Sequence, residues 1–172
     1  MRFQLHHDFD APLGQVERAL CDPALGPAVA LGTPSIESVT VVRHELGPDA
    51  LERVWRFQAR APFGILRGYG SAREMLCWEE HWRYAFAEHA GAWTVVPRGE
   101  LAPDAPWRRY FACEGSYTLE ALAGDGTRRR VGGTVEVRLP LVGAVVERLG
   151  LREIRKAYAA EAARLRTSCT PP

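Results

Sequence analysis

The residue with the clearest chemical potential is Glu80, because it falls within a run of large aromatic side chains. Residues 76–86 alternate between mostly large apolar types and mostly polar or small types, which is the period-two pattern of a half-buried β-strand. The alternation places three aromatic residues on the same face as this carboxyl, namely Trp78, Trp82 and Tyr84. Desolvation among apolar rings raises the pKa of a carboxyl. Glu80 is therefore a candidate general acid or base, or a partner for a ligand hydroxyl.

A structural role for Glu80 is the alternative interpretation. Its carboxylate could form an ion pair with Arg53 or Arg56 on the preceding strand, or its own strand could face the opposite way. Perturbed carboxyls mark functional sites only as a tendency, because structural ion-pair networks perturb them too. The pattern alone leaves both interpretations open.

His7 is a second candidate for the same interior. It lies between Leu5 and Phe9 in another alternating run, although a satisfied core histidine would give the same pattern. In an enzyme, Glu80 would carry out the acid–base step, and either Tyr84 or His7 would be its proton partner. The histidines and cysteines show no HExxH or comparable ligand spacing, so we expect no metal and no cofactor.

Hydrophobic periodicity and turn residues predict the elements that position these side chains. We expect a strand over residues 2–9, a short helix ending near residue 22, and a second brief helix or an irregular connector over 24–34. Further strands are predicted over 36–46, 51–60, 76–86, 92–98, 110–121 and 128–139. An amphipathic helix follows from residue 140 to about residue 166. We assign residues 1–168 to a single domain and 169–172 to a frayed tail.

This order predicts an α+β fold, in which a curved antiparallel sheet of about seven strands wraps around the long C-terminal helix. Such a sheet twists and curls, and one helix cannot fill its concave side alone. The predicted inner faces therefore offer an aromatic lining for a hydrophobic cavity. The predicted ligand-binding residues are Trp55, Phe57, Trp78, Glu80, Trp82, Tyr84 and Trp93. The same rings could instead simply fill the core.

Structural roles are also predicted for two further segments. Residues 61–71 interrupt the strands with glycines and apolar side chains, and the stretch from Pro62 to Tyr69 could form a mobile lid over the cavity mouth or a fixed plug. The run Arg128–Arg130 follows a turn and is interpreted as a solvated loop.

The composition is that of an ordinary globular protein, with 172 residues of which 47% are hydrophobic and 25% charged. The 22 basic and 21 acidic side chains leave a net charge of +1, so no general attraction to nucleic acid or acidic lipid is expected. The four cysteines are widely scattered and are interpreted as free thiols. No signal-peptide pattern and no apolar run of about 18 residues occurs, so we expect a cytoplasmic location without stable membrane insertion. The oligomeric state stays open.

The order of elements and both ends of the chain resemble the START-like superfamily, whose helix-grip fold is shared with birch pollen allergens and polyketide cyclases. The resemblance covers nearly the whole chain. The segments in which it is clearest are the opening MRFQLHHDFDAPLGQVERALCDP and the closing VEVRLPLVGAVVERLGLREIRKAYAAEAARL. The closing segment looks like that of an uncharacterised bacterial branch. The pattern of that branch, PLVG followed by Glu, is matched by Pro140, Leu141, Val142, Gly143 and Glu147.

The resemblance implies a cavity for a hydrophobic molecule such as a lipid, sterol or polyketide, in a superfamily that contains binders, transfer proteins and enzymes alike. The leading hypothesis is a non-catalytic binder or carrier of such a molecule, with Glu80 orienting it. One rival is a cyclase-like enzyme that uses Glu80 in acid–base chemistry. The other is a domain with a filled core that acts through a protein partner.

Overall fold

The computed structural model describes residues 1–60, 77–97, 110–138, 140–141 and 143–169. The described residues form seven strands and three helices: β1 (Arg2–Phe9), α1 (Leu13–Leu20), α2 (Leu25–Leu31), β2 (Ile36–Leu46), β3 (Ala50–Ala59), β4 (Cys77–Ala85), β5 (Ala90–Pro97), β6 (Phe111–Ala121), β7 (Thr127–Val137) and α3 (Gly143–Cys169). The predicted α+β class is confirmed, and the open choice between a helix and a connector after α1 is settled as a helix. The segment from Pro62 to Tyr69, predicted as a lid, lies outside the described residues.

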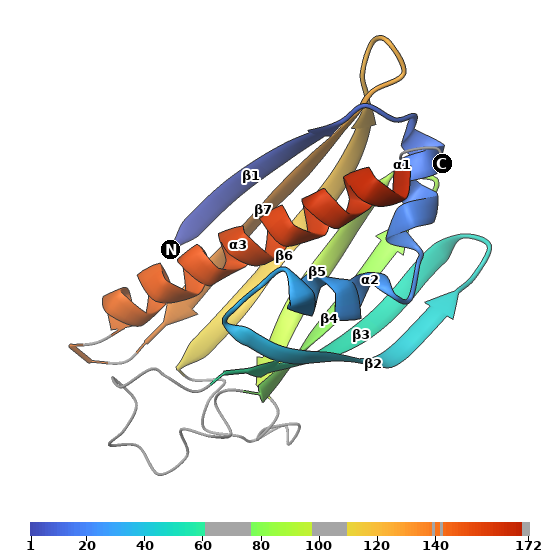
Figure 1. Ribbon diagram of the computed structural model, residues 1–172. Helices are drawn as coiled ribbons and strands as arrows, with labels where there is room; N and C mark the ends of the chain where they lie inside the picture. The colour runs from blue at the N-terminus through green and yellow to red at the C-terminus, as the bar shows by residue number, and fades with distance from the viewer. Residues whose placement is uncertain (61–76, 98–109, 139, 142, 170–172) are drawn as a thin grey trace.

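The seven described strands form one antiparallel sheet in the order β1-β7-β6-β5-β4-β3-β2. Every neighbouring pair is consecutive in sequence except β1 and β7, so the first and last strands lie side by side. The sheet curves, and α3 crosses its concave face, where α1 and α2 also lie (Figure 1). Both short helices contact α3. This arrangement is the expected helix-grip architecture.

The inner face of the sheet accommodates a large ring where a neighbouring position lacks a side chain. Gly115 of β6 is paired with Trp93 of β5, and a Cβ atom at Gly115 would lie 2.5 Å from the Trp93 ring. Real Cβ contacts are longer, so a glycine is required under this ring. Trp93 thereby fills space between the sheet and α3, where its centroid lies 6.4 Å from that of Tyr158.

Pro140, Leu141, Gly143 and Glu147 of the closing pattern lie at the junction between β7 and α3, and Val142 lies outside the described residues. Leu141 has a left-handed backbone, with a φ of 67°, which is uncommon for a residue other than glycine. Gly143 begins α3 so close to β7 that a Cβ atom there would overlap the carbonyl oxygen of Val137. Glu147 then accepts a hydrogen bond from the Val137 backbone N–H at 2.9 Å. These residues therefore fix the start of α3 against the end of the sheet.

The structure corrects two boundaries near the C-terminal end. The helix begins at Gly143 rather than at residue 140, because Pro140 and Leu141 form a turn. It ends at Cys169, so the prediction of a frayed tail from residue 169 is wrong for that residue. Cys169 is buried, and its carbonyl accepts a hydrogen bond from the Gln15 side chain of α1 at 2.7 Å. This tertiary contact extends the helix beyond the predicted end.

Two general predictions concern the cysteines and the membrane. All four cysteines are free thiols, as expected from their spacing. Of the helices in the described ranges, none combines enough length with enough apolar character to cross a membrane.

Candidate functional site

Five of the seven predicted ligand-binding side chains lie in the interior between the sheet and the helices. Each is between 0% and 6% exposed: Trp55, Phe57, Trp82, Tyr84 and Trp93. Trp78 and Glu80 on β4 are only half-buried. Most of the rings therefore belong to the packed core, whereas Trp78 and Glu80 remain accessible to an incoming molecule.

Two stacked aromatic pairs flank the Glu80 side chain along β4. Trp78 is parallel to Phe57 on β3, with 5.4 Å between the centroids and 6° between the planes. Further along the strand, Trp82 stacks on Tyr84 with a centroid distance of 5.5 Å. The period-two alternation predicted from the sequence thus places the carboxyl between apolar rings.

Glu80 lies opposite Trp55 of β3 and Val95 of β5 in the sheet register. Among the residues that the structure describes, none forms a hydrogen bond or ion pair with its carboxyl. Burial raises the pKa of Glu80 to about 7; the positive charge of Arg53 opposes this rise, and the negative charge of Glu161 adds to it. Near neutral pH the carboxyl therefore occupies both protonation states and can donate or accept a proton.

Arg53 is a polar residue of the interior that the sequence pattern did not indicate as a site residue. It is 3% exposed, and its guanidinium lies over the rings of both Trp55 and Trp82, 3.7 Å and 4.0 Å from their centroids. Its Nη2 donates to Glu161 of α3 at 3.3 Å. Its Nε and Nη1 are buried and find no hydrogen-bond acceptor among the described residues. The rings hold the guanidinium in place while two of its nitrogens stay unpaired.

A second buried arginine, Arg129, joins β7 to α3 through the same carboxylate. Its Nη1 donates to Glu161 Oε2 at 2.6 Å. Its Nη2 donates to the Tyr158 carbonyl at 2.9 Å and to His7 Nδ1 at 3.0 Å. The interpretation of Arg128–Arg130 as a solvated loop is wrong, because all three residues lie within β7, and alternation turns the side chain of Arg129 inward. One carboxylate thus serves two buried guanidinium groups.

The two predicted proton partners of Glu80 are engaged elsewhere. Because arginine can only donate, His7 accepts from Arg129 at Nδ1 and is neutral in this arrangement. Burial, and then the Arg129 charge, lowers the pKa of His7 to about 4. The Tyr84 hydroxyl donates to Glu17 of α1 at 2.7 Å, and burial followed by this hydrogen bond raises the pKa of Tyr84. Neither side chain forms a hydrogen bond with Glu80.

The alternative ion pair of Glu80 does not form with either arginine that the sequence suggested. Arg56 pairs with Glu79 on the outer face of the sheet at 2.6 Å, whereas Arg53 pairs with Glu161. Within the described ranges, no group of three or more His, Cys, Asp or Glu side chains is placed to hold a metal ion. Among the residues described here, the chemistry of this interior is that of a carboxyl without a hydrogen-bond partner beside buried guanidinium groups.

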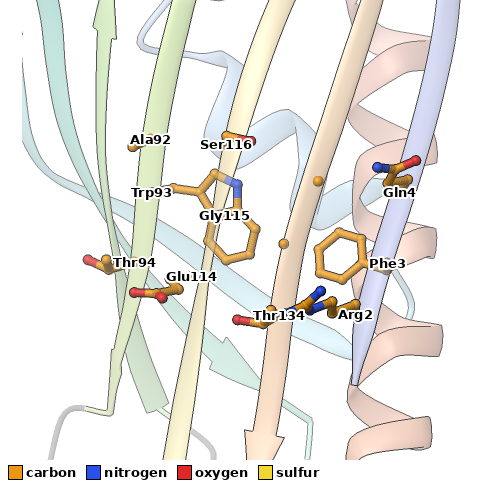
Figure 2. Close-up of a pocket in the computed structure, with 12 residues that line it drawn as sticks. Arg2, Phe3, Gln4, Ala92, Trp93, Thr94, Glu114, Gly115, Ser116 and Thr134 are labelled. Atoms are coloured by element: carbon orange, nitrogen blue, oxygen red, sulfur yellow. The ribbon is translucent and has the colours of Figure 1, made fainter.

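The outer face of the sheet has a separate hollow of about 760 Å³ over β1, β7, β6 and β5 (Figure 2). Small and polar side chains line it, among them Thr94, Ser116 and Thr134, and one basic and one acidic residue, Arg2 and Glu114, lie at its edge. By strand alternation these side chains point away from the helices. The hollow therefore opens on the opposite side of the sheet from the helices, and the rings of Phe3 and Trp93 also line it.

Several solved structures share the fold of this chain. TTHA0849 from Thermus thermophilus is 17% identical, with a TM-score of 0.65 and 99% of this chain and 100% of that chain covered. The Zhui aromatase/cyclase from Streptomyces sp. R1128 is 16% identical, with a TM-score of 0.63 and coverages of 98% and 93%. A START superfamily protein from Mycobacterium smegmatis is 16% identical, with a TM-score of 0.57 and coverages of 96% and 97%. These similarities confirm the START-like, helix-grip fold, and at such identities they show the fold alone.

The family follows from the sequence itself. Residues 4–168 match the family described as "Protein of unknown function (DUF2505)", and the chain belongs to this family. None of the curated proteins matches the chain.

Proposed function

We propose that this protein binds a largely apolar small molecule between α3 and the concave face of the sheet, next to Trp78 and Glu80. The observation that carries the proposal is the partial exposure of these two side chains on a face where Trp55, Phe57, Trp82, Tyr84 and Trp93 are almost fully buried. Trp78 offers a ring that is already stacked on Phe57, and Glu80 offers a single polar group. An apolar surface with few polar groups is typical of small-molecule sites.

Partly buried side chains from other elements border the same carboxyl. Val95 of β5 is its register partner, and Tyr158 of α3 is close enough for the Glu80 charge to raise its pKa, although burial is the larger cause. Both side chains are packed against the core without being fully covered by it. The proposed ligand would therefore contact the sheet on one side and α3 on the other. The START superfamily likeness supports this kind of binding at the level of the fold.

Acid–base catalysis by Glu80 on the bound molecule is a second candidate function. The observation that favours it is the pKa of about 7, because a general acid or base is most effective when its pKa is near the operating pH. The likeness to the Zhui aromatase/cyclase supports the same idea at the level of the fold. However, none of the described titratable side chains is hydrogen-bonded to Glu80, and catalysis usually needs such a partner. Binding is therefore the better-supported function.

Native mass spectrometry of the purified protein, followed by organic extraction, tests the proposal. A stoichiometric apolar molecule that is released unchanged supports binding, and a chemically altered product supports catalysis. A protein that remains free of ligand after incubation with lipid and polyphenol mixtures contradicts both, and favours a filled core that acts through a protein partner.

Titration with the neutral fluorophore N-phenyl-1-naphthylamine locates the site. Trp78→Leu removes the ring that would stack on the probe, so its affinity is expected to fall about tenfold. Phe86→Leu is the matched control, because Phe86 is a half-buried ring that follows the other end of β4. The affinity of this variant for the probe should stay within about twofold of that of the unchanged protein. Equal losses in the two variants contradict the proposed location.

A further inference from the structure

Among the described residues, the interior beside Glu80 contains more buried positive charge than negative charge when Glu80 is protonated. Arg53 and Arg129 are 3% and 0% exposed, and within the described part of the chain Glu161 is the one carboxylate paired with both. Its Oε1 accepts from Arg53 and its Oε2 from Arg129, so the single negative charge is shared between two guanidinium groups. Buried charges need a counter-charge and hydrogen-bond partners. One carboxylate for two guanidinium groups leaves positive charge uncompensated.

Among the described residues, Arg53 has two buried donors without a partner, whereas Arg129 has one, its Nε. The Nε and Nη1 of Arg53 have no acceptor among the described residues, and the contact of Arg53 with Glu161 is long, at 3.3 Å. Buried donors without an acceptor are destabilising and rare, so each one calls for an explanation. The rings of Trp55 and Trp82 restrain the guanidinium, so an arriving acceptor would find it already oriented.

We infer that the bound molecule carries a carboxylate, or another anionic oxygen group, that accepts hydrogen bonds from Arg53 at a position beside Glu80; this inference rests on the proposed function. The anionic group supplies both the acceptors and the negative charge that the interior lacks. The apolar part of the molecule extends towards Trp78. The ligand class is thus an amphiphilic acid with an aromatic or aliphatic body.

Glu80 makes this recognition dependent on pH. Within the described ranges, the charged and titratable groups that face it are Arg53 from β3, Cys113 from β6, and Tyr158 and Glu161 from α3. Burial raises the pKa of Cys113 to about 12 and that of Tyr158 well above its ordinary value, so neither thiol nor phenol ionises near neutral pH. Glu80, with a pKa of about 7, does ionise there. Its negative charge then competes with the ligand for Arg53, so affinity for an acid rises as the pH falls through 7.

Displacement of bound N-phenyl-1-naphthylamine by two matched ligands measures the preference for an anionic group. The ligands 2-naphthoate and 2-naphthylmethanol share one ring system and differ in the carboxylate, and both keep their charge across the range tested. At about pH 6, naphthoate is expected to bind about tenfold more tightly than the alcohol. At about pH 9 the preference should fall to about threefold or less, because Glu80 is then ionised.

Two variants assign the preference to the two side chains. Glu80→Gln cannot ionise, so it should keep the preference at both pH values, while Glu114→Gln on the outer face should leave the pH profile unchanged. Arg53→Gln should lose the preference for naphthoate over the alcohol and still bind the neutral fluorophore. If this variant does not fold, the pH profile of Glu80→Gln still tests the inference. Equal affinities for the two naphthyl ligands at about pH 6, or an unchanged pH profile in Glu80→Gln, overturn the inference and leave the proposed function standing. Failure of the unchanged protein to bind the neutral fluorophore overturns the proposed function itself.

Discussion

The guanidinium of Arg129 on β7 lies 2.6 Å from the carboxylate of Glu161 on α3. The other oxygen of that carboxylate binds Arg53 on β3 at 3.3 Å. In the sheet, β7 and β3 are separated by β6, β5 and β4. The network therefore ties α3 to two distant parts of the concave face. The position of the helix over the proposed ligand site depends on it.

Glu161→Gln is expected to lower the free energy of unfolding by about 3–5 kcal/mol, because it leaves two buried guanidinium groups without a counter-charge. Urea denaturation at neutral pH, followed by tryptophan fluorescence, measures the loss. Glu120→Gln is the control, since Glu120 pairs with Arg130 at 2.9 Å on the exposed surface. Its effect should be below about 1 kcal/mol. Similar effects in the two variants would show that the buried network does not hold α3.

His7 should make the fold sensitive to acid. Its pKa in the folded protein is about 4, below its ordinary value of 6.5, so the unfolded chain binds a proton at a higher pH than the folded protein does. The stability contributed by neutral His7 is fully present above 6.5 and is lost as the pH falls towards 4. His7→Gln should therefore lose less unfolding free energy than the unchanged protein between about pH 7 and about pH 4.5. The exposed neighbour His6 provides the control, His6→Gln, which should keep the original acid sensitivity. An unaltered acid response in His7→Gln is the contradicting result.

Glu80 should affect stability in the opposite pH range. Its folded pKa of about 7 lies above its ordinary 4.5, so its stabilising contribution is fully present below 4.5 and is lost as the pH rises through 7. Glu80→Gln is expected to be about 1–2 kcal/mol more stable than the unchanged protein at about pH 8, after allowance for the partial exposure of the side chain. Most of this gain should disappear at about pH 5, and Glu114→Gln should show no such pH dependence. Equal stability of Glu80→Gln and the unchanged protein at both pH values would mean that the carboxyl is not desolvated.

Gly115 should resist even the smallest substitution. Gly115→Ala places a Cβ atom against the carbonyl oxygen of Gly132 and 2.5 Å from the Trp93 ring, and overpacking of this kind costs about 1–3 kcal/mol. Gly132→Ala is the matched control on the adjacent strand, where the atom nearest to a Cβ would be 3.8 Å away, in ordinary contact. Thermal unfolding should show a clear loss for the first variant and little change for the second. If both behave alike, both the Trp93 ring and the backbone of β7 can move away from residue 115, and the interior is less tightly packed than the structure shows.

Local patterns were sufficient to predict which face of β4 carries Glu80. Alternation over a few residues fixes which side chains share a face, and the register with Trp55 and Val95 agrees with it. The order of strands and helices was predictable for the same reason, because hydrophobic period and turn residues are local properties. The length of α3 was less predictable, because the hydrogen bond from Gln15 to Cys169 joins residues that are far apart in sequence.

The buried charge network could not be predicted in the same way. Arg53 alternates in phase with Trp55, and Arg129 with Val131, so a signal for their inward direction was present in the sequence. Charged residues are nevertheless rarely buried unless they are paired. Their shared partner, Glu161, lies 108 residues from Arg53 along the chain, and only the packing of α3 on the sheet brings them together.

A crystal structure of the protein with N-phenyl-1-naphthylamine bound tests the central claim most directly. We predict that the probe lies between α3 and the concave face of the sheet, in contact with Trp78 and next to Glu80. A probe bound instead in the outer hollow, beside Thr94 and Ser116 (Figure 2), would contradict the claim that the interior is the binding site.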